Sequence, residues 1–223
     1  MNHASSQGAR SRVRTFGGLS GIAGVLLLIT SFSLLNGPGS DLGPAELVRF
    51  GHEHFSTILV QAWLQAVAPI LIALFAFVLV HLSGATSHPS GWMTFLGFSL
   101  LLNVSMLEVA FYIAALFDQP AGLPFLSIKI ISAIQHLYFV VAAPTVFLPL
   151  GIVLLKSKIL PQLWAYSALG LAAAFATLGI AYMSTLVLPR AVTAFASVQA
   201  LWWLTAAVML IVRRPSLPSE QSS

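Results

Sequence analysis

The sequence predicts an all-α membrane protein, a polytopic bundle of six transmembrane helices with both termini in the cytoplasm. The first observation behind this prediction is composition: 58% of the 223 residues are hydrophobic and only 7% are charged, against about a quarter charged in ordinary soluble domains. The second is that the apolar residues form six runs, each long enough for the ~20 residues that a helix needs to cross a bilayer. The third is the uneven distribution of basic residues among the loops. These observations predict a single domain embedded in lipid.

The first helix is expected to follow a basic segment. Residues 1–16 are polar and contain Arg10, Arg12 and Arg14, and we expect them to form a cytoplasmic N-terminal segment. The apolar run at about 17–35 is the first predicted span. A signal peptide also has a basic start and an apolar core, but this run is long and no clear cleavage site follows it. The spacing of Gly17 and Gly21 would permit close helix contact, although both could be ordinary membrane glycines.

A turn and a short helix are expected to connect the first two spans. Residues 36–43 are rich in Gly, Ser and Pro, which is typical of a turn. Pro44 suits the first position of a helix in the sequence PAELVRF, which we expect at the membrane interface. The other spans are predicted at about 55–82, 92–117, 127–155, 163–188 and 194–212. The membrane domain then covers 17–213, and the polar tail, 214–223, is expected to be disordered in the cytoplasm.

The basic residues predict the orientation. Seven of the ten Lys and Arg fall on the side of the termini and three on the opposite side, and cytoplasmic loops carry an excess of basic residues. The seven are Arg10, Arg12, Arg14, Lys156, Lys158, Arg213 and Arg214, and the three are Arg49, Lys129 and Arg190. Both termini are therefore predicted in the cytoplasm. Because these residues form no basic patch with interleaved aromatics, we do not expect a nucleic-acid partner.

Three stretches of the chain carry a resemblance to a known group of proteins. They are GGLSGIAGVLLLITSFSLL, PAELVRFGHEH and AAPTVFLPLGIVLLKSKILPQLWAYSALG, the last containing the turn between the fourth and fifth spans. This pattern resembles a broad group of small bacterial inner-membrane proteins classed as domains of unknown function. The resemblance implies the architecture and a multi-pass location in the bacterial inner membrane. It assigns no functional residue, because the group has no established activity.

Glu108 is a carboxylate in the middle of the apolar stretch NVSMLEVAFY. An ionisable group at membrane depth costs about 2.5–3.5 kcal/mol on insertion scales, so it normally faces a protein interior or water. Glu108 is nine residues from Phe117, His136 nine from the predicted start of its span, and Gln65 ten from Phe55. At 1.5 Å per residue all three lie roughly 14 Å below the outer boundary. Equal depth predicts one shared site for Gln65, Glu108 and His136.

Helical periodicity extends this candidate site. Residues three, four or seven apart share a helix face, which places Tyr112 with Glu108, Lys129 with His136, and Gln199 with Trp202. Pro69 and Pro144 each leave a carbonyl without its donor, and such backbone is tolerated beside a cavity. The sequence therefore predicts a pocket that opens to the outer side. Its predicted ligand-binding residues are Gln65, Glu108, Tyr112, Lys129, His136, Gln199 and Trp202, and Glu108 and His136 are also the candidate catalytic residues.

Several functions are compatible with this pattern. The pocket could bind or move a small lipophilic or amphipathic molecule, with a homo-oligomer as one arrangement. Alternatively, Glu108 and His136 could act as an acid/base pair on a lipid or isoprenoid-like substrate. A third alternative is an accessory subunit that contacts partners through small-residue faces, Gly170–Ala174 and Ala168–Ala172. In a purely structural alternative, Glu108 bonds to His136 or Lys129 and holds the helices together.

A metal or haem site ranks below these alternatives. The chain has no cysteine, so metal ligands would have to be His or carboxylates. His52 and His54 are the candidate metal ligands, but two such residues on a helix point about 200° apart and would chelate one ion only from an extended segment. A haem site usually needs facing histidines at similar depth, and only His136 is deep. The sequence identifies no cofactor.

Overall fold

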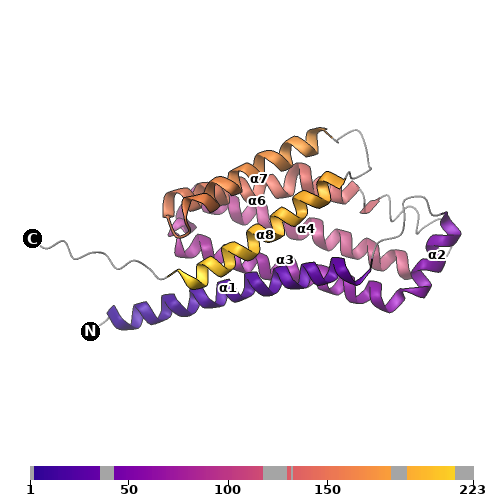
Figure 1. Ribbon diagram of the computed structural model, residues 1–223, viewed down its shortest axis with the longest axis horizontal. Coiled ribbons are helices and arrows are strands. Elements are labelled where there is room, and N and C mark those ends of the chain that lie inside the picture. The colour runs from indigo at the N-terminus through magenta and orange to yellow at the C-terminus, as the bar shows by residue number, and fades with distance from the viewer. Residues whose placement is uncertain (1–2, 36–42, 118–129, 132, 182–189, 214–223) are drawn as a thin grey trace, which may run out of the picture.

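The protein is described here from a computed structural model, which covers residues 3–35, 43–117, 130–131, 133–181 and 190–213. Its elements are helical throughout these ranges, and six helices are long and apolar enough to cross a membrane. Successive spans run in opposite directions, so both termini lie at one end of the bundle (Figure 1). We call this the termini end. The opposite end, which carries the short helix α2, is called the α2 end.

The helices follow the predicted runs closely. Their bounds are α1 His3–Leu34, α2 Pro44–Glu53, α3 Phe55–Leu82, the 3₁₀ turn η1 Ala85–Ser87, α4 Pro89–Phe117, the π-helix η2 Tyr138–Ala142, α6 Ala143–Ser157, α7 Gln162–Ala181 and α8 Arg190–Val212. Residues 130–137 form a helical segment that continues into η2, apart from residue 132, which is not described. The predicted bounds of the third helix, Phe55–Leu82, are confirmed. The predicted turn at 36–42, the tail at 214–223 and part of the fourth and fifth predicted spans fall outside the described residues.

The first helix differs from its prediction. We expected the span to begin at residue 17 after a separate basic segment, whereas α1 already begins at His3. Arg10, Arg12 and Arg14 therefore lie on a helical extension of the first span. The reason is that Ala, Arg and Gln in this segment are good helix formers and no proline interrupts it.

Glycines let α1 pack in the groove between α3 and α8. A Cβ atom on Gly17 would lie 2.5 Å from Cγ1 of Val78 on α3, and one on Gly18 would lie 2.3 Å from Cγ1 of Ile211 on α8. A Cβ on Gly21 would lie 2.8 Å from both Ala207 and Phe75. Backbones can approach this closely only where side chains are missing. The close contact predicted at Gly17 and Gly21 is therefore confirmed.

The centre of the bundle is an aromatic cluster around Trp203. Its side chain is 1% exposed and contacts Phe75 of α3, Phe98 of α4 and Phe147 of α6, with ring centroids 6.0, 5.8 and 5.1 Å away. Such pairs contribute about 0.5–1.5 kcal/mol each beyond their burial. One side chain of α8 thus joins three other spans.

The outward faces of the spans are also apolar. Large side chains such as Trp63, Phe32 and Leu96 are exposed on the bundle surface. A monomeric soluble protein rarely exposes so much apolar surface. The described helices therefore indicate a multi-pass protein with a lipid bilayer around it.

Candidate functional site

Glu108 has a hydrogen-bond partner on the neighbouring span. It lies on α4, nine residues before the helix ends at Phe117, which is roughly 14 Å from that end at the helical rise. Its Oε1 accepts a hydrogen bond of 2.7 Å from Nε2 of Gln135, on the segment that precedes η2. Both side chains are partly buried. The predicted intramembrane carboxylate is thus held against a second span from the α2 half of the bundle.

The predicted partners of Glu108 were His136 and Lys129. Glu108 and His136 are both described, and neither a hydrogen bond nor an ion pair joins them. This prediction is wrong because consecutive helical residues point about 100° apart, and Gln135 is the one that faces α4. Depth along the helix does not determine rotation about its axis. Lys129 lies outside the described residues.

A second hydrogen bond connects the same region to α8. The hydroxyl of Tyr138 donates to Oε1 of Gln199 over 2.6 Å, and the Gln199 side chain is buried in the bundle. Tyr112 lies four residues after Glu108 on α4, and Tyr138 lies three residues after Gln135, so each is near one partner of the first hydrogen bond along its own helix. Three spans therefore contribute to one group of polar side chains, which we call the polar cluster. Its hydrogen-bonded members are Glu108, Gln135, Tyr138 and Gln199. We include Tyr112 and His136, which lie on the same two segments of the chain.

His136 contributes a buried atom without a partner. Its Nε2 is shielded from solvent and has no hydrogen bond to any described residue. Leaving such a group unsatisfied costs about 1–3 kcal/mol, and the great majority of buried polar atoms in proteins are paired. The next residue along the chain is Gln135, whose amide is already bonded to Glu108. An unused hydrogen-bonding site therefore lies on the residue that follows the partner of Glu108, which is the only described carboxylate within the spans.

The helix changes its geometry directly after His136. In η2 the N–H of Ala143 donates to the carbonyl of Tyr138, five residues earlier rather than four. Pro144 follows and has no N–H, so the carbonyl of Val140 loses its usual donor. Short π-helices of this kind occur frequently at functional sites. The sequence predicted irregular backbone at Pro144 but not the π-helix.

Two glycines hold this irregular segment against its neighbours. A Cβ on Gly179 of α7 would lie 2.8 Å from Cα of Val140 in η2. A Cβ on Gly97 of α4 would lie 2.2 Å from the carbonyl oxygen of Thr145, early in α6. The backbone around η2 is thus in direct contact with α4 and α7, which positions Gln135, His136 and Tyr138 at its start.

Among the other predicted site residues, Trp202 packs in the aromatic core, whereas the proximity of Gln65 to the polar cluster stays a prediction. Trp202 is buried, its Nε1 donates to Oγ of Ser167 over 2.9 Å, and its ring packs on Phe147 at 5.3 Å. It therefore belongs to the aromatic core, and the hydrogen bonds and ring contacts of its side chain within the described ranges are with Trp164, Ser167, Phe147 and Trp203. Gln65 is buried on α3, and the structure shows no hydrogen bond between it and the described members of the cluster. Sequence reasoning missed Gln135 and Tyr138, since their partners are 27 and 61 residues away along the chain.

The predicted metal ligands lie near the α2 end. His52 is on α2 and exposed, while His54 follows α2 and packs on Phe50, with ring centroids 4.7 Å apart. Within the described ranges, no three His, Asp or Glu side chains are grouped as metal ligands would be.

Of the two small-residue faces predicted on α7, one faces the core of the bundle and the other faces its surface. Ala168 and Ala172 are buried in the hydrophobic core, so the prediction that they face a partner is wrong. Gly170 points into open space, with nothing within 4 Å of an added Cβ. The face from Gly170 to Ala174 remains a predicted contact surface for a partner or a second copy.

Comparisons with known protein families, with curated proteins and with solved structures find no match for this chain. The chemistry of the polar cluster is therefore the basis for a functional argument. It offers a carboxylate, two amides, two phenols and an imidazole within a membrane-spanning bundle. Such groups recognise a ligand by hydrogen bonds, which are strong where water is scarce.

Proposed function

We propose that the protein binds a small amphipathic molecule in the bacterial inner membrane, with the polar group of that molecule at the polar cluster. The observation that carries this proposal is the buried Nε2 of His136, which has no described partner. A ligand hydroxyl or amine would satisfy this nitrogen, and the second oxygen of Glu108 offers a further acceptor on the neighbouring span. The apolar part of the ligand would remain among the apolar side chains or in lipid.

The location and orientation are part of the same proposal. The resemblance to small bacterial inner-membrane proteins supports the location. The basic residues at the termini end support a cytoplasmic position for both termini, because Arg10, Arg12, Lys156 and Lys158 are all exposed there. The polar cluster, on the α2 half of the bundle, would then be reached from the outer leaflet.

Replacement of Glu108 with Gln tests the proposal. The amide oxygen of the variant still accepts a hydrogen bond from Gln135, so we expect the free energy of unfolding to change by no more than about 1 kcal/mol. The charge that would bind a ligand amine or hydroxyl is lost. Organic extracts of the purified wild type should contain a small amphipathic molecule in stoichiometric amount by mass spectrometry, and extracts of Glu108→Gln should be depleted of it at least about tenfold.

Asn103→Ala provides the matched control. Asn103 lies on the same helix, is exposed and donates to the carbonyl of Ser99, so its loss removes a polar group from α4 outside the polar cluster. This variant should retain the molecule at the wild-type level. Equal retention by all three proteins, or the absence of any such molecule from the wild type, would contradict the proposed function.

A further inference from the structure

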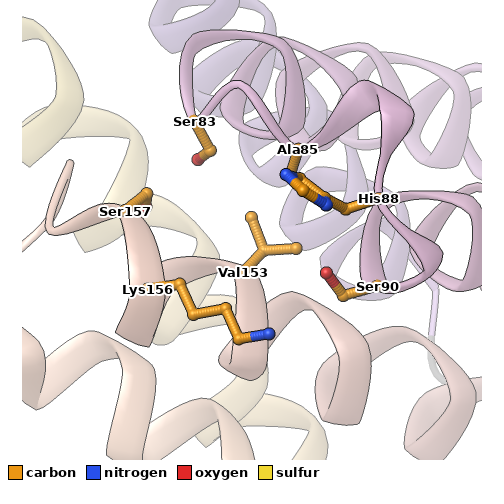
Figure 2. Close-up of a pocket in the computed structure, with 7 residues that line it drawn as sticks. All are labelled: Ser83, Ala85, His88, Ser90, Val153, Lys156 and Ser157. Carbon is orange, nitrogen blue, oxygen red and sulfur yellow. The ribbon is translucent and has the colours of Figure 1, made fainter.

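A polar hollow lies at the termini end, far from the polar cluster along the bundle. It has a volume of about 240 Å³ and lies between the α3–α4 connection and the last turns of α6. Its polar lining consists of Ser83, His88, Ser90, Lys156 and Ser157 (Figure 2). No function considered above uses these residues.

The floor of this hollow is built by close backbone packing. Gly84 adopts a φ of +67° and turns the chain after α3. A Cβ on Gly91 would lie 2.0 Å from the carbonyl oxygen of Ala85, so glycine is needed there for η1 to pack on the first turn of α4. Ala85 and Val153 are both buried and form one small hydrophobic cluster with Val80. The hollow is therefore a fixed feature of the fold and does not depend on flexible surface side chains alone.

Three side chains offer hydrogen-bond donors to a ligand in the hollow. The hydroxyls of Ser83 and Ser157 already donate to the carbonyls of Leu79 and Leu154. The donors that remain are the ammonium of Lys156, the ring N–H of His88 and the hydroxyl of Ser90, none of which donates to another described residue. Figure 2 shows these three side chains arranged around Val153.

The charge of this region favours an anion. Ser90 lies in the first turn of α4, at the end of a long helix where the aligned peptide dipoles give a partial positive charge. Lys156 adds a full charge and has no ion pair with a described residue. The described carboxylates are Glu46, Glu53 and Glu108, all on the α2 half of the molecule. No described acid therefore competes for these donors.

The depth and size of the hollow narrow the class of anion. Trp92 is 60% exposed beside it, and its Nε1 donates to the carbonyl of Thr86. Exposed Trp side chains of membrane proteins concentrate at the level of the lipid headgroups. The volume of about 240 Å³ is below the ~300–1,000 Å³ of pockets for drug-sized ligands, so it suits one compact group. We propose that the hollow binds a phosphate group, either the headgroup phosphate of an anionic phospholipid or free phosphate.

The test compares Lys156→Gln with Lys158→Gln in the full-length protein. Both variants remove one exposed positive charge from the same end, but only Lys156 lines the hollow. Each protein is reconstituted in phosphatidylcholine nanodiscs with and without phosphatidylglycerol, and the retained lipid is counted by native mass spectrometry. We expect Lys156→Gln to lower the preference for phosphatidylglycerol about tenfold, the effect of one hydrogen bond to a charged group. Lys158→Gln should lower it by no more than about twofold, the effect of a screened surface charge.

A second arm distinguishes the two sources of phosphate. Inorganic phosphate is added to the protein in nanodiscs of phosphatidylcholine alone. The unfolding midpoint is compared with that in a buffer of equal ionic strength that contains neither phosphate nor sulfate. A rise that Lys156→Gln abolishes supports the site with free phosphate as its ligand, whereas retention of phosphatidylglycerol alone supports the site with a lipid headgroup. Equal losses in the two lysine variants, or no response of the wild type in either arm, would overturn the proposal. His88→Gln provides a second variant and should weaken the same response.

Discussion

Tyr138 shows how single residues connect distant parts of this chain. Its hydroxyl donates to Gln199 on α8 over 2.6 Å, and it lies three residues after Gln135, the hydrogen-bond partner of Glu108 on α4. Gln199 is 8% exposed, so its carbonyl oxygen has little access to any other donor. One phenol therefore couples the polar cluster to the last span.

Removal of this hydroxyl should destabilise the protein. Tyr138→Phe leaves Oε1 of Gln199 without its donor, and we expect the free energy of unfolding to fall by about 1–3 kcal/mol, the cost of a buried unsatisfied acceptor. Denaturation of the purified protein in detergent measures this. Tyr166→Phe is the control, because Tyr166 is 60% exposed on α7 and should change stability by no more than about 0.5 kcal/mol. Equal free energies of unfolding for the two variants would mean that the hydrogen bond between Tyr138 and Gln199 does not stabilise the bundle.

For single residues, the sequence identified the polar side chains in the apolar spans, but it did not identify their hydrogen-bond partners. Glu108, Tyr112, His136 and Gln199 were identified because polar groups are costly in an apolar span. Gln135 was missed as the partner of Glu108 because the rotation of one helix against another depends on packing of the whole bundle. Trp202 was assigned to the pocket by its stacking with Gln199, whereas its ring packs in the core.

Among the elements, α4 and the span that contains η2 and α6 determine the geometry of the site. Gly97 brings α4 against Thr145, and Gly179 brings α7 against Val140. The π-helix between them contains one residue more than a regular turn. It therefore rotates Gln135 and His136 by about 100° relative to α6, compared with an uninterrupted α-helix.

Gly97→Ala should separate α4 from α6. The added Cβ would lie 2.2 Å from a backbone oxygen, which no side-chain rotation can relieve, so we expect a loss of about 1–3 kcal/mol of stability from overpacking. Gly170→Ala is the matched control in a helix, since nothing lies within 4 Å of its Cβ. It should be neutral or stabilise by up to about 1 kcal/mol. Thermal unfolding of both variants in one detergent checks this contrast, and a neutral Gly97→Ala would contradict the close contact.

Element boundaries were predictable because the apolar runs are long and end in Gly, Ser or Pro. The bounds of α3 and the end of α4 at Phe117 agree with the prediction. The early start of α1 was missed because hydropathy marks the membrane-crossing part of a helix and not its polar extension. The π-helix was missed because Pro144 predicts irregular backbone without specifying its kind, and the close contact of Val140 with Gly179 depends on the packing of the whole bundle.

For the whole molecule, the two ends differ in charge. The termini end carries Arg10, Arg12, Lys156, Lys158 and Arg213, whereas Glu46 and Glu53 lie on α2. The proposed phosphate site lies at the basic end, and the polar cluster lies in the opposite half. This polarity was predictable from the sequence, because it depends only on the alternation of spans and loops.

Ligand binding at the polar cluster would also affect the stability of the whole protein. A ligand that binds only the folded state raises the free energy of unfolding, by about 2.7 kcal/mol at a concentration a hundred times its dissociation constant. Without ligand, the unpaired Nε2 of His136 lowers stability by about 1–3 kcal/mol. The substitution His136→Leu would remove the cost of the unpaired nitrogen, and it would also remove the proposed ligand contact.

The unfolding midpoint of the wild type and of His136→Leu, each measured with and without added lipid extract from the host membrane, is the most direct test of the proposed binding site. The binding role of His136 predicts a reversal: the variant is more stable in clean detergent, whereas only the wild type gains stability from the extract. Two results would contradict this role: an equal response of both proteins to the extract, or a lower stability of His136→Leu than of the wild type without extract. In either case Nε2 of His136 does not bind a ligand, and the proposed function is wrong.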